Sequence, residues 1–172
     1  PKYEAFRAAV EKFPTVNPKK YELVCYLRWL ALSYIGGGLM TDYDVIPGTF
    51  IPRDLEEIRK SATMNVLQSN GNGGVVPSAV FAGKKALDKW ITTLAGYKLD
   101  DQDTHKGVPH TSDQMILNRN QKQDWIVQHQ FVKEIGEDGW RGAKLVHFAA
   151  GACANHLPGT SKSALMTQFL QM

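Results

Sequence analysis

Two aspartates one residue apart, Asp42 and Asp44, are the residues whose types and spacing could do chemistry. We expect them on a short strand over residues 39–45, where alternate side chains project to the same side. Carboxylates on one face repel each other unless a cation or a proton lies between them. Hard divalent ions such as Mg²⁺ and Mn²⁺ take such oxygen ligands and leave room for phosphate groups. The pair therefore predicts a metal-held phosphate site, with an acidic turn that caps a strand as the alternative.

Arg28 lies in a mostly apolar segment, residues 21–39, in which the other charged residue is Glu22. An unpaired guanidinium in such a helix would be costly. We therefore expect Arg28 to have an anionic partner, which is either a carboxylate of the fold or a ligand.

Residues 27–47 resemble the sugar-binding region, with its DXD motif, of certain glycosyltransferases. These are the fungal Golgi mannosyltransferases, the capsular polysaccharide enzymes of bacteria and the clostridial glucosylating toxins. The positions that match are Leu27, Arg28, Leu32, Tyr34, Gly37, Gly38, Asp42, Asp44 and Pro47. Cys25 and Met40 depart from the family pattern, which usually has an aspartate and a tyrosine there. Because that aspartate helps to hold the donor sugar in the family, the choice of sugar is open here.

The resemblance implies metal-dependent transfer of a sugar from a UDP- or GDP-sugar to an acceptor hydroxyl of a glycan, lipid or protein, with retention of configuration. It implies that Asp42, Asp44 and His147 hold Mn²⁺ or Mg²⁺, and that Arg28 and Asp42 contact the donor. His147 opens a His-Phe-x-x-Gly segment similar to one that completes the metal site in related enzymes. A purely structural histidine is the alternative. Lys162, with His156, is a candidate for contacting the diphosphate.

A second segment, Ser112-Asp113-Gln114, resembles a motif that these enzymes carry near the sugar and the acceptor. By this resemblance Asp113 is the catalytic residue that orients the sugar or the acceptor hydroxyl, and Gln114 contacts the donor. The alternative is a plain helix N-terminus with an acidic residue that suits the helix dipole.

Composition bounds the remaining possibilities. At 172 residues, with 43% hydrophobic and 22% charged residues, the chain is expected to form a single domain over residues 1–172. A net charge of +3 without a basic run argues against a nucleic-acid partner, and no apolar run is long enough to span a membrane. Two cysteines make no disulfide framework, and nothing indicates a cellular compartment. Because the chain begins at Pro1, we expect a fragment.

Hydrophobic periodicity and turn residues predict an α/β fold. Helices are expected at 1–13, 18–35, 84–94, 110–118 and 162–171, with a helical turn at 55–59. Strands are expected at 39–45, 63–67, 75–82 and 144–148, a turn at 69–74, loops at 98–110 and 149–159, and either state at 125–135. The resemblance implies a GT-A-like mixed sheet flanked by helices, and nothing before Tyr3 can supply the N-terminal nucleotide-binding strand of that fold.

Two other functions remain open. A phosphohydrolase of the haloacid dehalogenase type also uses an Asp-x-Asp pair, but it needs an apolar strand directly before the first aspartate and threonine or valine where this chain has Ile46. A catalytically degenerate protein that binds nucleotide sugars or carbohydrates is the other alternative. The departures at Cys25 and Met40 and the short N-terminal region favour it.

Overall fold

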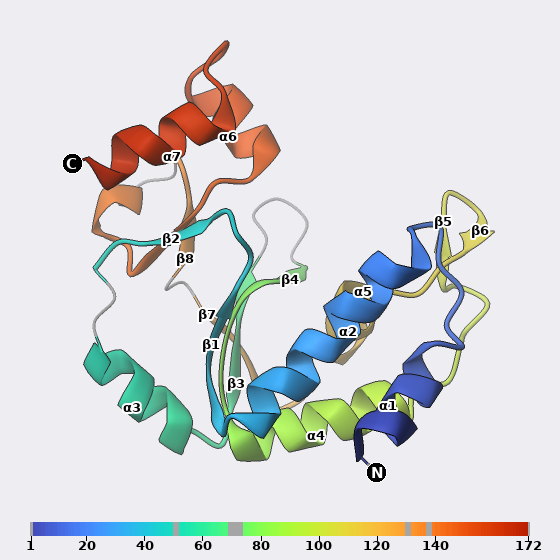
Figure 1. Ribbon diagram of the computed structural model, residues 1–172. Coiled ribbons are helices and arrows are strands. Elements are labelled where there is room, and N and C mark those ends of the chain that lie inside the picture. The colour runs from blue at the N-terminus through green and yellow to red at the C-terminus, as the bar shows by residue number, and fades with distance from the viewer. Residues whose placement is uncertain (1, 50–51, 69–73, 130–131, 137–138, 172) are drawn as a thin grey trace.

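The computed structural model describes residues 2–49, 52–68, 74–129, 132–136 and 139–171 and has a mixed α/β architecture (Figure 1). Its helices are α1 (Lys2–Val10), α2 (Lys19–Tyr34), α3 (Pro52–Lys60), α4 (Lys84–Ala95), α5 (Asp113–Asn120), α6 (Ala150–His156) and α7 (Lys162–Leu170), with a 3₁₀ turn η1 (Trp140–Gly142). Within these described residues, no helix is long and apolar enough to cross a membrane.

The strands form a larger and a smaller sheet. The four-stranded sheet has the order β1 (Gly37–Thr41), β4 (Val75–Gly83), β3 (Met64–Gln68) and β7 (Ile126–His129). Its β1–β4 and β3–β4 pairs are antiparallel and its β3–β7 pair is parallel, so the sheet is mixed. The three-stranded sheet has the order β2 (Val45–Pro47), β9 (Leu145–His147) and β8 (Val132–Glu134). A separate hairpin joins β5 (Thr104–His105) to β6 (Val108–Pro109).

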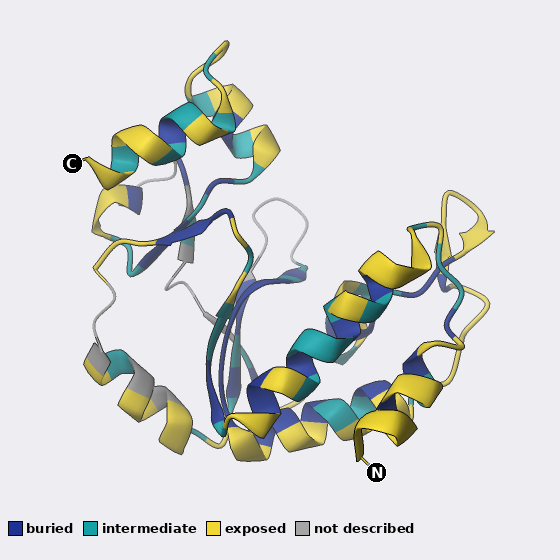
Figure 2. Cartoon of the chain, in the orientation of Figure 1, coloured by how far each residue is buried: buried dark blue, intermediate teal, exposed yellow. Residues whose placement is uncertain are grey.

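Strand β4 is buried along almost its whole length because both faces of the sheet are covered (Figure 2). Val80 and Ala82 belong to the main hydrophobic cluster, which also takes side chains from α2, α4 and α5. Ala79 and Phe81 alternate with them and pack with residues of β2 and β9 on the other face. The larger sheet is thus sandwiched between helices and the smaller sheet, whose own far side packs against α6 and α7.

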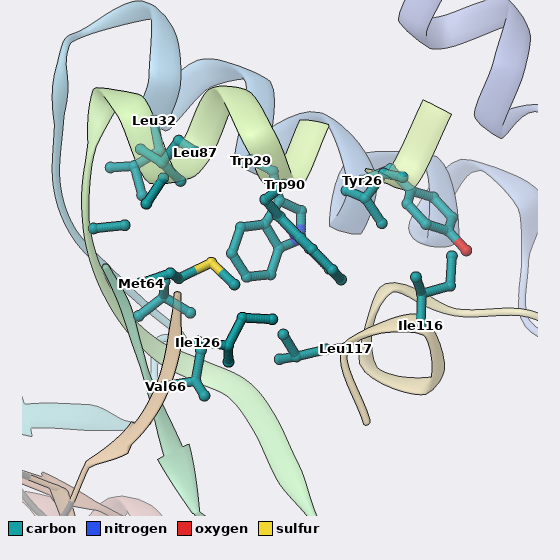
Figure 3. Packing of buried hydrophobic residues seen from close by; sticks show 14 of the residues in the cluster. Tyr26, Trp29, Leu32, Met64, Val66, Leu87, Trp90, Ile116, Leu117 and Ile126 are labelled. Atoms are coloured by element: carbon teal, nitrogen blue, oxygen red, sulfur yellow. The ribbon is translucent and has the colours of Figure 1, made fainter. Parts of the chain in front are cut away.

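Helix α2 packs one face on the core of the domain and exposes the other, because it directs large side chains inward at helical spacing. Tyr26, Trp29 and Leu32 are all buried, and Trp29 packs edge-to-face on Trp90 of α4 with ring centroids 5.4 Å apart (Figure 3). Met64 and neighbouring sheet residues cover the same cluster from below. This packing holds rigidly the helix that carries Arg28.

The triple glycine after α2 turns the chain into β1 through positive backbone angles, with φ of 90° at Gly36, 96° at Gly37 and 143° at Gly38. A Cβ atom on Gly37 would lie 2.4 Å from the carbonyl oxygen of Ala82 on β4. The glycine at position 37 therefore allows the backbone of β1 to lie close to the neighbouring strand β4.

Gly37→Ala is expected to lower the free energy of unfolding by about 2 kcal/mol or more, because it adds a backbone clash to an unfavourable φ. Urea unfolding followed by tryptophan fluorescence measures this. Gly36→Ala is the matched control, because Gly36 has a similar φ and nothing within 4 Å of the added atom. Equal losses in the two variants would show that the clash costs nothing.

Most predicted elements are present, and four segments differ. The predicted strand at 39–45 is wrong at residues 42–44, because the aspartates lie in a turn between β1 and β2. The predicted loop 149–159 contains α6, the loop 98–110 contains the β5–β6 hairpin, and the ambiguous segment 125–135 holds β7 and β8. Of the predicted turn at 69–74, residues 69–73 lie outside the described part of the chain.

Candidate functional site

The acidic turn, which comprises Asp42, Tyr43 and Asp44, joins the larger sheet to the smaller one. The amide of Asp42 donates to the carbonyl of Ser78 on β4 (2.8 Å), and the amide of Phe148, just after β9, donates to the carbonyl of Asp44 (2.8 Å). The turn is closed by the amide of Val45, which donates to the carbonyl of Asp42 (3.2 Å). Backbone hydrogen bonds to both sheets therefore fix the turn.

Arg28 connects this turn to helix α5. Its Nη1 donates to Asp42 Oδ1 (2.6 Å) and its Nη2 donates to Asp113 Oδ2 (3.0 Å). The side chain of Arg28 is 22% exposed, whereas that of Asp113 is 5% exposed and that of Asp42 is 38% exposed. The anionic partner expected for Arg28 is thus a pair of carboxylates that belong to the fold, one buried and one open to solvent.

Asp113 is held at the start of α5 by its neighbours. Ser112 caps the helix, its hydroxyl accepting from the amide of Met115 (3.2 Å). The indole Nε1 of Trp29 donates to Asp113 Oδ2 (2.8 Å). Burial raises the pKa of Asp113, while the charge of Arg28 and the hydrogen bond from Trp29 act in the opposite direction.

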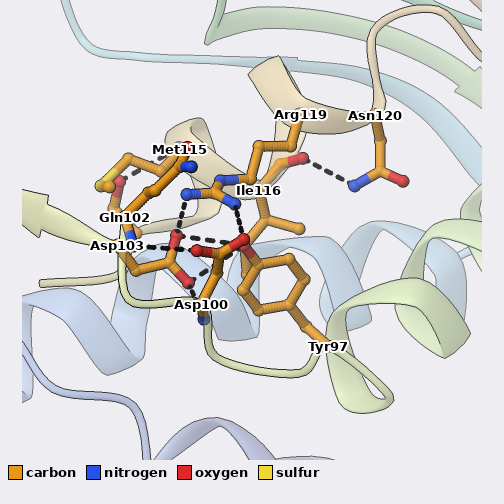
Figure 4. A network of polar contacts seen from close by, with 9 residues as sticks. Tyr97, Asp100, Gln102, Asp103, Met115, Ile116, Arg119 and Asn120 are labelled. Carbon is orange, nitrogen blue, oxygen red and sulfur yellow. Dashed lines mark hydrogen bonds and ion pairs between the residues drawn. The ribbon is translucent and has the colours of Figure 1, made fainter.

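A polar network anchors α5 from its outer side (Figure 4). The guanidinium of Arg119 pairs with Asp100 (3.0 Å) and with the buried Asp103 (2.8 Å), and the hydroxyl of Tyr97 donates to Asp103 (3.1 Å). Burial, and then the hydrogen bond to Asp103, raise the pKa of Tyr97 to about 12, so it remains a donor at neutral pH. The network ties the loop before α5 to the helix and so helps to position Asp113.

Asp44 contacts a different set of groups from Asp42. Lys162 Nζ on α7 donates to Asp44 Oδ2 (2.5 Å), and His147 Nε2 at the end of β9 lies 3.8 Å from the same oxygen. Asp44 Oδ1 is buried and has no hydrogen-bond partner among the described residues. Burial lowers the pKa of the Lys162 ammonium. The hydrogen bond to Asp44 and the negative charge of Asp44 raise this pKa by more, so the net shift is upward.

The two aspartates are therefore not arranged as alternate residues of one strand, because each is drawn to its own cation: Asp42 to Arg28 and Asp44 to Lys162. Over the residues that the structure describes, no group of three or more His, Cys, Asp or Glu side chains could hold a metal ion. His147 lies 3.8 Å from Asp44, and Lys162 pairs with the same carboxylate. The metal-binding and diphosphate roles that the resemblance implies for these two residues stay predictions.

Two further positions from the sequence have clear surroundings. Gln114 is exposed in the first turn of α5, directly after Asp113. Cys25, which replaces the family's aspartate, is half-buried on α2. Burial, and then the negative charge of Asp113, raise the pKa of the Cys25 thiol, so it stays uncharged at neutral pH.

Sequence reasoning missed two residues of the site, Trp29 and Tyr43. A buried tryptophan needs a partner for its indole N–H, so the position of Trp29 next to Arg28 was a usable signal. Tyr43 lies between Asp42 and Asp44, and a large aromatic side chain between two charged ones is itself informative.

Comparison with known proteins supports the fold and says little about the sequence family. No protein-family model matches the sequence, and no curated protein matches it. Among solved structures, the chain is similar to a glycosyltransferase involved in the glycosylation of the major capsid of PBCV-1, with a TM-score of 0.55 and 10% sequence identity. The similarity covers 100% of this chain and 95% of that one. At this identity it shows a shared fold. A glycosyltransferase is thus a structural neighbour of the whole chain.

Proposed function

We propose that this protein is a GT-A-like glycosyltransferase that moves a sugar from a UDP- or GDP-sugar to an acceptor hydroxyl of a glycan, lipid or protein. The observation that carries the proposal is the double ion pair of Arg28. It joins Asp42 of the acidic turn to Asp113 of α5, although 85 residues separate Arg28 from Asp113. All three were candidate donor-site or catalytic residues, and the fold is shared with a glycosyltransferase.

The residues around Asp44 suit the departing group of such a reaction. When the bond between sugar and diphosphate breaks, negative charge grows on the diphosphate and positive charge on the sugar ring. The ammonium of Lys162, held at 2.5 Å from Asp44 Oδ2, is a cation that could face the diphosphate oxygens. His147 Nε2, 3.8 Å from the same oxygen, adds a further polar group on this side of the turn.

A metal ion bound at this site would rely on Asp44 and on oxygen atoms of the substrate, and not on a preformed set of protein ligands. The buried Asp44 Oδ1, without a hydrogen-bond partner in the described part of the chain, is an oxygen that a cation would satisfy. Mg²⁺ is commonly bound by one or two carboxylates together with substrate phosphates, so a third protein ligand is not essential. We propose that Asp44 holds Mn²⁺ or Mg²⁺ together with phosphate oxygens of the donor. Asp42 and His147, the other two ligands that the resemblance implies, do not form a three-ligand group with Asp44 among the described residues. When bound, the metal ion would neutralise charge on the departing diphosphate.

Arg28 and Asp113 are proposed to act on the sugar side. Because Asp42 and Asp113 hold the Arg28 guanidinium from two directions, its orientation is fixed, and the N–H groups of its two terminal nitrogens that these carboxylates leave free would contact the donor. Burial raises the pKa of Asp113. This residue would orient the sugar or the acceptor hydroxyl, and Gln114 beside it would contact the donor. Retention of configuration is proposed from the resemblance alone.

Calorimetric titration with UDP- and GDP-sugars tests the proposal directly. We expect one of these donors to bind in the presence of Mn²⁺, and excess EDTA to lower turnover by about 10²–10³-fold, as loss of a main charge-stabilising group does. Unchanged turnover in EDTA would contradict the metal dependence. Failure of every nucleotide sugar to bind would contradict the transferase function.

A second candidate, a degenerate binding protein, is favoured by one contact. Lys162 already neutralises Asp44, and the uncharged Cys25 stands where the related enzymes have an aspartate. Turnover of the donor that binds in the titration separates the two, because a degenerate protein would bind a nucleotide sugar or a saccharide and yet turn over no donor.

A further inference from the structure

Tyr43, at the centre of the acidic turn, presents its ring to solvent. The residue is 85% exposed, whereas Asp44 beside it is 9% exposed. Both neighbours are engaged with cations of the fold, Asp42 with Arg28 and Asp44 with Lys162. The exposed ring is thus the part of the turn that is directed outward.

The backbone below this ring is fixed by the hydrogen bonds that tie the acidic turn to the two sheets. Asp42 donates through its amide to Ser78, and Asp44 accepts through its carbonyl from Phe148, at 2.8 Å in each case. A ring on a rigid turn loses little conformational freedom when a ligand packs on it, which favours binding. Isolated exposed aromatic residues are ordinary on protein surfaces, so the surroundings of the ring must decide its role.

Those surroundings suit a carbohydrate. The Nζ atom of Lys162 lies over one face of the Tyr43 ring, 5.0 Å from its centroid, so a sugar would stack on the opposite face; Asp42, 38% exposed, lies beside the ring in the turn. The face of an aromatic ring is electron-rich, so it attracts the weakly positive C–H groups on one face of a pyranose. The carboxylate of Asp42 can pair with hydroxyl groups around the edge of that pyranose.

We propose that Tyr43 is the platform on which a pyranose ring of the acceptor glycan stacks. This inference rests on the proposed function and specifies its acceptor as a carbohydrate. Because Asp44 and Lys162 are the inner groups assigned to the diphosphate, the donor's leaving group lies toward the protein. The second substrate then approaches from the solvent side, where the Tyr43 ring is.

Saturation-transfer NMR with a panel of methyl glycopyranosides at millimolar concentrations tests the proposal. We expect at least one glycoside to bind, and Tyr43→Ala to weaken its binding by about tenfold, the scale of one aromatic stacking contact. Tyr43→Phe and Tyr43→Trp should keep binding, because they keep the ring. Since Tyr43 is 85% exposed, these variants are expected to unfold at the same temperature as the unmodified chain.

Tyr34→Ala is the matched control, because Tyr34 is a tyrosine that is 91% exposed at the end of α2. The two tyrosines lie before and after strand β1, whose five residues span about 13 Å. Binding should be unchanged in this variant.

Three results would overturn the inference: no glycoside binds, Tyr43→Ala binds as the unmodified chain does, or uridine and guanosine, rather than glycosides, lose their binding in Tyr43→Ala. The last would assign the ring to the donor's base. The outcome is separable from the donor titration. Nucleotide-sugar binding without glycoside binding refutes the platform alone, and glycoside binding at Tyr43 without nucleotide-sugar binding refutes the transferase alone.

Discussion

Arg28→Met is expected to lower the free energy of unfolding by about 3–5 kcal/mol, the usual result of removing one partner of a buried ion pair. Asp113, 5% exposed at its side chain, would keep the hydrogen bond from Trp29 and lose its counter-ion. Urea unfolding followed by tryptophan fluorescence measures the loss.

The pH dependence of this loss identifies its cause. Burial raises the pKa of Asp113, and removal of Arg28 takes away the largest influence that lowers it. A carboxyl whose pKa is higher in the folded than in the unfolded chain binds its proton more strongly when folded, so stability falls as the pH rises above the ordinary pKa of aspartate, about 3.9. The deficit of Arg28→Met should therefore be small near that pH and grow toward neutrality.

Two controls separate the buried charge from the loss of an arginine in general. Arg7→Met removes another helical arginine, one whose pair with Glu11 is 44% exposed on both sides, and should cost at most about 1 kcal/mol. The double variant Arg28→Met with Asp113→Asn removes the buried unpaired charge and leaves only Asp42, 38% exposed, without its arginine, so it should recover part of the stability. If Arg28→Met alone were as stable as the unmodified chain, the ion pair would not be what holds Asp113 in place.

Asp44→Asn is expected to abolish donor turnover, with a loss of at least about 10²–10³-fold. The amide has nearly the same shape, but it cannot neutralise a cation in the way that the carboxylate does. Turnover of the UDP- or GDP-sugar that binds in the calorimetric titration measures the loss, and the melting temperature reports any change in folding. The ammonium of Lys162, 27% exposed, can turn to water, so the structural cost should be small.

Asp54→Asn is the matched control for this change. The side chain of Asp54 on α3 is 14% exposed and pairs with Lys144, whereas that of Asp44 is 12% exposed and pairs with Lys162. Both variants thus remove the charge of a largely buried aspartate from a lysine pair. Full turnover in Asp44→Asn would refute a role in the reaction, and equal losses in both variants would indicate a general effect on folding.

Much of the fold could be predicted from local patterns. Helices α2 and α4 and strand β4 have strong hydrophobic periodicity or long apolar runs, and strand β3 alternates weakly. Each was predicted to within about three residues. The segment of α6, in contrast, consists mostly of small and polar residues with no clear period, so it was taken for a loop. The short strands β7 and β8 exist because they pair with β3 and β9, which no local pattern reveals.

For the candidate site, the sequence by itself determined which groups required partners. Arg28 in an apolar helix had to meet an anion, and two aspartates one residue apart had to meet cations, because burying an unpaired charge costs more than a fold can tolerate. Only the tertiary structure decided which partners these are. Asp113 and Lys162 reach the site through contacts that span 85 and 118 residues, and the sheets and helices that bring them there leave no mark on the spacing of nearby residues.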